Sequence, residues 1–87
     1  MLMLHHLRIL PAVAAEGSLS AAARRLHYSQ PTISYHLARM ERYFGARLVD
    51  RGVRGAELTE AGSVLLPHAE AMLRQLARAE RDVASVT

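Results

Sequence analysis

The strongest restriction on the fold is a connection of only three residues, His27–Ser29, between two segments with helical patterns. The first segment, about residues 19–26, contains three consecutive alanines, whose small side chains let a neighbouring helix approach closely. The second has Pro31 in its first turn, where a missing N–H removes no helical hydrogen bond. Two short helices joined by so short a turn cross closely. The pattern therefore predicts a helix-turn-helix over residues 19–38.

The second of these helices has two contrasting faces. Its apolar residues recur at helical spacing and define the buried face; they are Ile33, Leu37, Met40 and Phe44. On the other side, Gln30 can pair with adenine, Pro31 can contact a thymine methyl, and Thr32 can serve bases or phosphates. Because a helix-turn-helix presents its second helix to the major groove of DNA, we expect residues 30–43 to form a recognition helix. A helical hairpin that packs in this way without touching DNA is the alternative.

Charge and composition favour a nucleic-acid partner and exclude several other classes. All 11 basic residues are arginines, whose planar fork suits phosphates and guanine edges. Residues 1–57 have a net charge of +4, whereas residues 58–87 have −1. The 15 alanines and 13 leucines favour helices and argue against an all-β sandwich or a disordered chain. The absence of cysteine excludes disulfides and thiolate metal sites and indicates a reducing cytoplasm.

A leading helix is predicted over the first 15 or so residues. Its apolar residues at helical spacing are Leu4, Leu7, Leu10, Val13 and Ala14. Pro11 lies within this pattern and is expected to kink the helix. We expect Gly17 to end it, and Ser18 or Ser20 to cap the helix that follows.

A hairpin is predicted after the recognition helix. Residues 47–50 and 56–58 have the pattern of two short strands around a glycine-rich tip. Arg51 and Arg54 flank the glycines of this tip, where arginines can lie along phosphates or enter a narrow minor groove. We interpret the hairpin as a wing on DNA, and a solvated surface loop is the alternative.

The last helix, predicted from about residue 59 to residue 85, has an apolar stripe with steps of four and three residues. This spacing is typical of a coiled-coil seam, and a narrow stripe of this length predicts a second copy of the chain as its partner. Pro67 is expected to bend the helix. The predicted dimer interface consists of Leu65, Ala69, Met72, Leu76, Ala79 and Val83.

Several linked motifs occur in order along the first two thirds of the chain. They are GSLSAAARRLH at 17–27, SQPTIS at 29–34, LxxME at 37–41, FGxRL at 44–48, Arg51, and LTEAG at 58–62. Together they resemble the amino-terminal domain of LysR-type transcriptional regulators, closely over residues 3–68. The fold class implied is mainly α: a winged helix-turn-helix of three helices and a two-stranded wing at 1–58, with its wing at 47–58, followed by a linker helix at 59–87.

The resemblance also implies binding partners and a cellular location. Homodimers would form through antiparallel linker helices and bind dyad-symmetric promoter DNA. They would act in the bacterial cytoplasm, associated with the nucleoid. A tetramer is possible in the full-length protein. A larger effector-binding domain, absent from this chain, would bind a small molecule. No membrane partner is expected, because no apolar run is long enough to span a bilayer.

Site residues follow from the polar face and from positions carried over from the family. Base contacts are expected from Gln30, Pro31, Thr32 and Tyr35. Backbone contacts are expected from Ser20, Ser29, Ser34, His36, Arg39 and Arg42, with Arg51 and Arg54 on the wing. Tyr35 and His36 stand where many family members have Arg or Gln, so base preference at these steps does not transfer from relatives.

Other kinds of function find little support. No nucleophile, phosphate-loop or dinucleotide motif is present, so we expect neither an enzyme nor a cofactor. His5 and His6 lie on different faces of a helix, and no histidine pair has a spacing of four residues, so no metal site is expected. Two alternatives remain: a protein-interaction module built on the last helix, and a small-molecule-sensing repressor complete in 87 residues, for which no spare apolar surface is evident.

Overall fold

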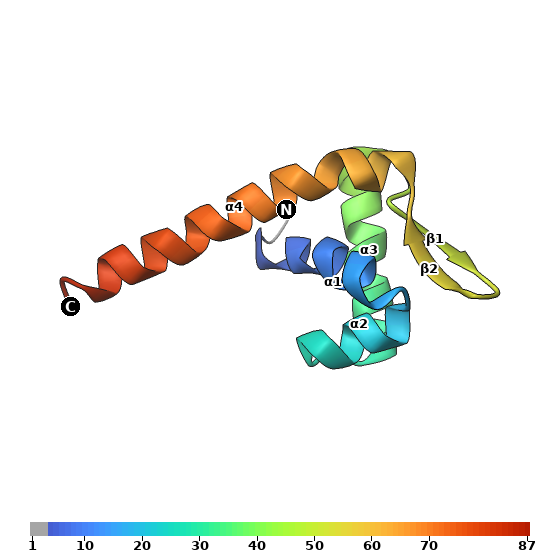
Figure 1. Ribbon diagram of the computed structural model, residues 1–87, viewed down its shortest axis with the longest axis horizontal. Coiled ribbons are helices and arrows are strands. Elements are labelled where there is room, and N and C mark those ends of the chain that lie inside the picture. The colour runs from blue at the N-terminus through green and yellow to red at the C-terminus, as the bar shows by residue number, and fades with distance from the viewer. Residues whose placement is uncertain (1–3) are drawn as a thin grey trace.

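The computed structural model describes residues 4–87 and contains four α-helices and a two-stranded antiparallel hairpin (Figure 1). The predicted fold class, a winged helix-turn-helix followed by a long helix, is confirmed. A 3-10 helix, Leu4–Arg8, precedes the regular elements. The α-helices are α1 (Ile9–Glu16), α2 (Leu19–Leu26), α3 (Gln30–Phe44) and α4 (Glu60–Ala84), and the strands are β1 (Val49–Gly52) and β2 (Gly55–Leu58).

The helix ends follow the capping residues of the sequence. Hydroxyl oxygens of Ser18, Ser29 and Thr59 accept backbone N–H bonds at the starts of α2, α3 and α4. Gly17 and Gly45 end α1 and α3 in the left-handed conformation. The helix-turn-helix thus consists of α2 and α3, and Ser18 rather than Ser20 caps α2.

The start of the chain differs from its prediction. Leu4–Arg8 is a 3-10 helix, and the α-helix begins only at Ile9. Pro11 is thereby the third residue of α1, where the helical ladder has no acceptor for its missing N–H. The change of helix type accommodates the proline, and Ala14 is exposed instead of facing the core. Residues 1–3, the beginning of the predicted helix, lie outside the described residues.

The core lies where α1, α2, α3 and the first half of α4 meet. Its largest side chains with essentially no exposed surface are Leu7, Ile9, Leu10, Val13, Ile33, Leu37, Met40, Leu48 and Val49. Three of the four residues predicted to form the buried face of α3 belong to this set. The fourth, Phe44, is 39% exposed, because it lies at the last turn of α3, beyond the helices that cover Met40.

The hairpin and α4 project from the body in opposite directions, so that the molecule measures 49 Å in its longest dimension (Figure 1). In the hairpin, Val49 pairs with Leu58 and Gly52 with Gly55, leaving Val53 and Arg54 at the tip. The first strand begins two residues later than predicted. α4 is continuous through Pro67. Within residues 4–87, no helix combines the length and apolarity needed to cross a membrane.

Candidate nucleic-acid interface

The side of α3 that faces solvent carries most of the predicted base-contact residues. Gln30 and Pro31 are exposed in its first turn, and Tyr35 is 56% exposed one turn later. The Ser29 hydroxyl caps the helix, accepting the N–H of Thr32 at 3.2 Å and donating to the Thr32 hydroxyl at 2.8 Å. This double contact fixes the Thr32 side chain against the helix end, so the first turn of α3 presents a rigid polar surface.

Tyr35 and Arg39, one turn apart on α3, form a side-chain pair. The Arg39 Nη1 donates to the Tyr35 hydroxyl at 3.5 Å, and the guanidinium carbon lies 5.7 Å from the centre of the tyrosine ring. A cation near an aromatic face is attracted by the electrons of the ring. The pair therefore places an arginine beside the tyrosine, on the exposed side of the recognition helix.

His36 lies away from this exposed face. Its ring stacks on that of His6 from the 3-10 helix, with centroids 3.7 Å apart, and lies 5.2 Å from the ring of Tyr28. Its Nδ1 atom is buried and has no hydrogen-bond partner among the described residues. Burial lowers the pKa of His36 below its usual value of 6.5, and the nearby charges of Arg39 and His5 lower it further. The structure thus places the His36 side chain in the contact between α3 and the 3-10 helix.

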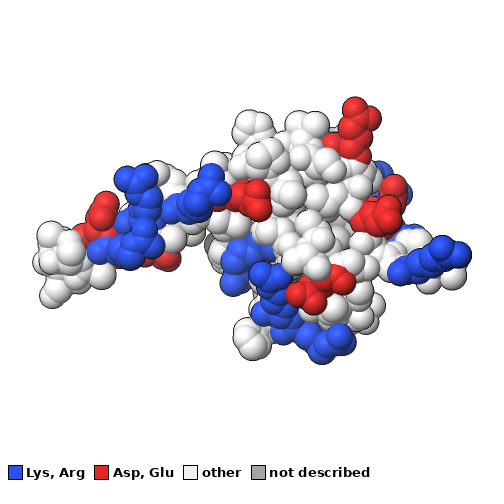
Figure 2. Space-filling view, viewed as in Figure 1, with Lys and Arg blue, Asp and Glu red and all other residues white. Residues whose placement is uncertain are grey.

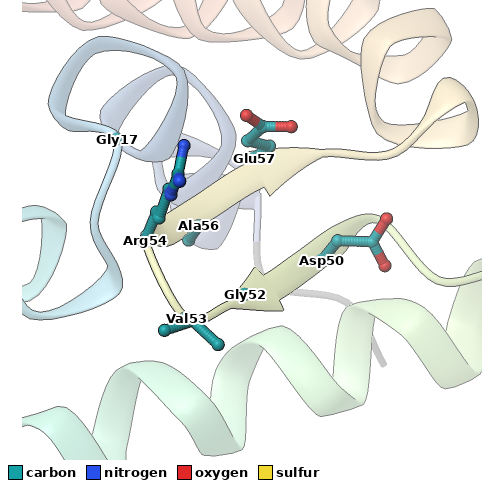
Figure 3. Close-up of a pocket in the computed structure, with 8 residues that line it drawn as sticks. Gly17, Asp50, Gly52, Val53, Arg54, Ala56 and Glu57 are labelled. Carbon is teal, nitrogen blue, oxygen red and sulfur yellow. The ribbon is translucent and has the colours of Figure 1, made fainter.

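The wing lies beside the start of α2. In the orientation of Figure 1, a basic patch lies at the tip of the hairpin near acidic side chains, and further basic groups lie under the body and along α4 (Figure 2). Arg51 and Arg54 are exposed there, and Val53 at the tip is fully exposed. A hollow along the hairpin is lined by Gly17, Asp50, Arg54 and Glu57, which the close-up shows (Figure 3).

Two backbone contacts hold the hairpin against the loop between α1 and α2. The Ala56 N–H donates to the Gly17 carbonyl at 3.0 Å. Gly55 has a φ of 135°, and a Cβ atom there would collide with the Gly17 carbonyl oxygen. Glycine is therefore required at Gly55 both by its conformation and by the closeness of the two backbones. This contact fixes the wing near Ser18 and Ser20, at the start of α2.

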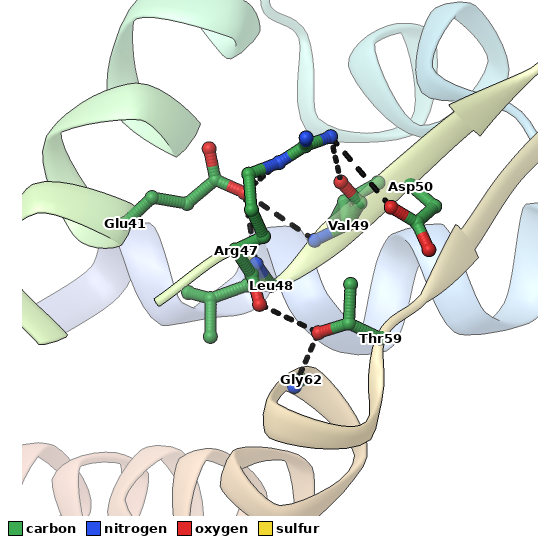
Figure 4. A network of polar contacts seen from close by, with 7 residues as sticks. All are labelled: Glu41, Arg47, Leu48, Val49, Asp50, Thr59 and Gly62. Atoms are coloured by element: carbon green, nitrogen blue, oxygen red, sulfur yellow. Dashed lines mark hydrogen bonds and ion pairs between the residues drawn. The ribbon is translucent and has the colours of Figure 1, made fainter. Parts of the chain in front are cut away.

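A polar network joins the other end of the hairpin to α3 and α4 (Figure 4). The Glu41 carboxylate accepts the backbone N–H groups of Leu48 at 2.8 Å and Val49 at 3.4 Å. The Arg47 guanidinium lies 3.7 Å from the Glu41 carboxylate and donates to the Val49 carbonyl at 3.0 Å. The Thr59 hydroxyl donates to the Arg47 carbonyl at 2.6 Å while it caps α4.

This network explains two departures from the sequence expectations. The backbone of Arg47 and Leu48 bonds to Glu41 and Thr59, and the paired strand therefore starts only at Val49. Glu41 and Arg47 act as anchors of the wing, a role that the sequence reasoning missed. A signal was present, because both residues belong to the motifs that carry the family resemblance. The helical pattern and the net charge, however, do not show which groups Glu41 and Arg47 contact.

The predicted seam on α4 divides into two parts. Ala69 has no exposed surface and belongs to the core of the chain itself, so its assignment to an interface between chains is wrong. Leu65 is half-buried against that core. Farther along, Met72 is 38% and Val83 61% exposed. The stripe therefore covers the chain's own body near its start and is open to solvent beyond it.

Comparisons with known sequences match most of the chain. A family model described as "Bacterial regulatory helix-turn-helix protein, lysR family" matches residues 4–63. The chain is 49% identical over 70 residues to the "Probable RuBisCO transcriptional regulator" of Nostoc sp., a match that covers 80% of this chain and 21% of that protein. It is 45% identical over 67 residues to the "HTH-type transcriptional regulator TfdS" of Cupriavidus pinatubonensis, covering 77% and 23%. The chain thus spans about a fifth of the length of these relatives.

Solved structures match the whole architecture. The chain in the "CbnR_DBD-DNA complex" is 37% identical, with a TM-score of 0.86 and coverage of 98% of this chain and 99% of that one. The chain in the "BenM_DBD/benA site 1 DNA Complex" is 28% identical, with a TM-score of 0.85 and the same coverage. Full-length CbnR matches with a TM-score of 0.87 at 36% identity, covering 95% of this chain and 29% of that one. The arrangement of α3, wing and α4 is thus shared with proteins solved on DNA.

Proposed function

The chain belongs to the lysR family of bacterial regulatory helix-turn-helix proteins, and from this premise we propose that it binds duplex DNA sequence-specifically as part of a transcriptional regulator. The observation that carries the proposal is the exposed, capped first turn of α3, which presents Gln30 and Pro31 to solvent. The shared architecture with two DNA-binding domains solved on DNA supports it. The relatives are regulators, and the function is binding rather than catalysis.

In this proposal α3 enters the major groove and the wing contacts the adjacent backbone or minor groove. Bases are contacted by Gln30, Pro31, Thr32 and Tyr35. The backbone is contacted from α2, α3 and the wing by Ser20, Ser29, Ser34, Arg39, Arg42, Arg51 and Arg54. His36, which the sequence suggested as a further backbone contact, is held by His6 and does not belong to the proposed set.

We also propose that residues 59–87 act as a linker helix that joins two chains on a dyad-symmetric promoter site. The apolar stripe beyond the body of the chain supports this role, since Met72 is 38% and Val83 61% exposed. The Nostoc relative is about four times as long as this chain. In a protein of that length, binding of a small-molecule effector and formation of a tetramer would depend on other parts. Such a regulator acts in the cytoplasm, at the nucleoid.

The proposal is tested by fluorescence anisotropy with the chain's own upstream intergenic DNA and a scrambled duplex, over a series of salt concentrations. Tighter binding to the intergenic duplex, falling steeply with salt, is the expected result, because phosphate contacts release counterions. Equal binding to both duplexes would contradict sequence reading by α3. No binding at low salt would favour the alternative, a protein-interaction module that uses α4.

Gln30→Ala is expected to weaken binding to the specific duplex by about 1–3 kcal/mol and to relax preference at one base position. The side-chain amide is exposed in the first turn of α3 and can form two hydrogen bonds to adenine. Anisotropy against the specific duplex and its single-base variants measures both effects. Gln75→Ala, at an exposed glutamine of α4, is the control and should bind normally. Equal losses on specific and scrambled DNA would refute a base contact.

Arg54→Ala is expected to weaken binding to all duplexes alike and to reduce the salt slope by about one unit. The reason is that Arg54 lies exposed at the hairpin tip, where its guanidinium can neutralise a phosphate. The measurement is the slope of log affinity against log salt concentration. Val53→Ala removes the neighbouring exposed side chain without changing the charge and should leave the slope unchanged. An Arg54→Ala slope equal to that of the parent chain would rule out a phosphate contact.

A further inference from the structure

Two histidines from separate elements stack directly behind the exposed face of the recognition helix. His6 lies on the 3-10 helix and His36 on α3, and their ring centroids are 3.7 Å apart with the planes inclined by 24°. Tyr28, from the turn between α2 and α3, lies edge-on to the His6 ring at 6.4 Å, and its ring is tilted against that of His36 at 5.2 Å. One aromatic cluster therefore joins the 3-10 helix, the turn and α3.

The charged groups around this stack are mainly cationic. From the 3-10 helix, His5 and Arg8 act on His6, and Arg39 of α3 acts on both rings of the stack. Tyr35 of α3 adds a neutral ring 5.7 Å from that of His36. On the α4 side, Glu80 lines a surface hollow with His5 and Arg8. No carboxylate is among the charges that act on His6 or His36.

We propose that the His6–His36 stack positions the recognition helix for DNA, and that protonation of the stack weakens DNA binding. This inference rests on the proposed function. The stack is a contact between α3 and the 3-10 helix near the middle of α3. Two neutral imidazoles can lie face to face at this distance, whereas a second positive charge would repel the first and its cationic neighbours. Separation of the rings would loosen the contact that holds the middle of α3 against the 3-10 helix.

The direction of the pKa shifts of both rings supports a loss of DNA binding on protonation. Burial lowers the pKa of both histidines below 6.5, and the positive charges nearby lower it further. The neutral form is therefore favoured while the rings are stacked, and protonation favours their separation. The stabilisation by the stack is complete above the ordinary histidine pKa and is lost as the pH falls through 6.5 toward the lowered values.

The sign of the pH dependence separates this role from a direct phosphate contact. A histidine that contacts a phosphate binds better when protonated, so acidification would strengthen DNA binding. A loss of affinity on acidification therefore requires a protonation that disfavours the binding conformation.

The test is the affinity of the 87-residue chain for its specific duplex, measured by anisotropy between about pH 8 and about pH 5.5 at constant ionic strength. We expect affinity to fall by about fivefold or more, the lower end of usual couplings between sites. His6→Phe keeps an aromatic ring in the stack but removes its proton site. This variant should bind like the parent at the upper pH and lose most of the pH dependence.

His68→Gln is the matched control, because it removes an exposed histidine of α4 outside the cluster and should retain the full pH dependence. Circular dichroism at each pH establishes that every variant is folded. In the parent chain, NMR titration of the imidazole protons should place both His6 and His36 below the ordinary pKa. Ordinary titration of these rings, or affinity that rises or stays constant in acid, would overturn the proposal. Absence of specific binding at every pH would instead refute the proposed function.

Discussion

Met72→Glu is expected to convert the chain from a dimer into a monomer and to weaken binding to a duplex with two half-sites by about 10²- to 10⁴-fold. Met72 is 38% exposed and lies near the middle of the apolar stripe on α4. In an antiparallel pair of helices the middles of the two stripes meet, so the substitution would bring two carboxylates together in an apolar contact. Each recognition helix would then bind its half-site alone.

Sedimentation equilibrium and anisotropy measure the two parts of this prediction. Ala71→Glu is the control, because it adds the same charge at the preceding residue, which is exposed and lies about 100° around the helix from Met72. This variant should remain dimeric and bind both half-sites. A Met72→Glu chain that still dimerises would show that the exposed stripe is not the interface. A parent chain that is monomeric at all accessible concentrations would show that residues 59–87 do not suffice for pairing.

Gly62→Ala is expected to lower the free energy of unfolding by about 3 kcal/mol, the upper end for an overpacked site. Gly62 is buried in the first turn of α4, where a Cβ atom would collide with the Leu48 carbonyl oxygen and lie 3.3 Å from the Leu58 Cβ. The colliding atom belongs to the backbone, so a change of side-chain rotamer cannot relieve the contact. α4 and the backbone of Leu48 would have to separate, which disturbs the Thr59 contacts that hold the wing.

Urea unfolding at one fixed protein concentration measures this loss, because dimerisation contributes to apparent stability. Gly52→Ala is the control: a Cβ atom there meets only the Gly55 carbonyl oxygen, at 3.9 Å. Its stability should change by no more than about 0.5 kcal/mol. Similar unfolding midpoints for the two variants would mean that α4 moves away from Leu48 at little cost.

Local signals were sufficient for the helices and their ends. The apolar spacing of α3 predicted three of the four residues of its buried face, Gly17 predicted the end of α1, and a serine at position 18 or 20 was expected to cap α2. These features depend on residues within one or two turns of each other, so they can be recognised in a linear sequence. The family motifs indicated that a wing follows the helix-turn-helix. The residues alone left a solvated surface loop as the alternative for this hairpin.

Contacts between distant segments were decided only by the tertiary structure. Periodicity showed that one side of α4 is apolar, but not that Ala69 is covered by the chain's own core while Met72 stays exposed. The pattern of α3 placed His36 at the edge of the helix, and only the fold brought His6 onto its ring. The physical reason is the same in both cases: a sequence pattern determines which face a helix buries, whereas the segment that covers it depends on how the whole chain packs.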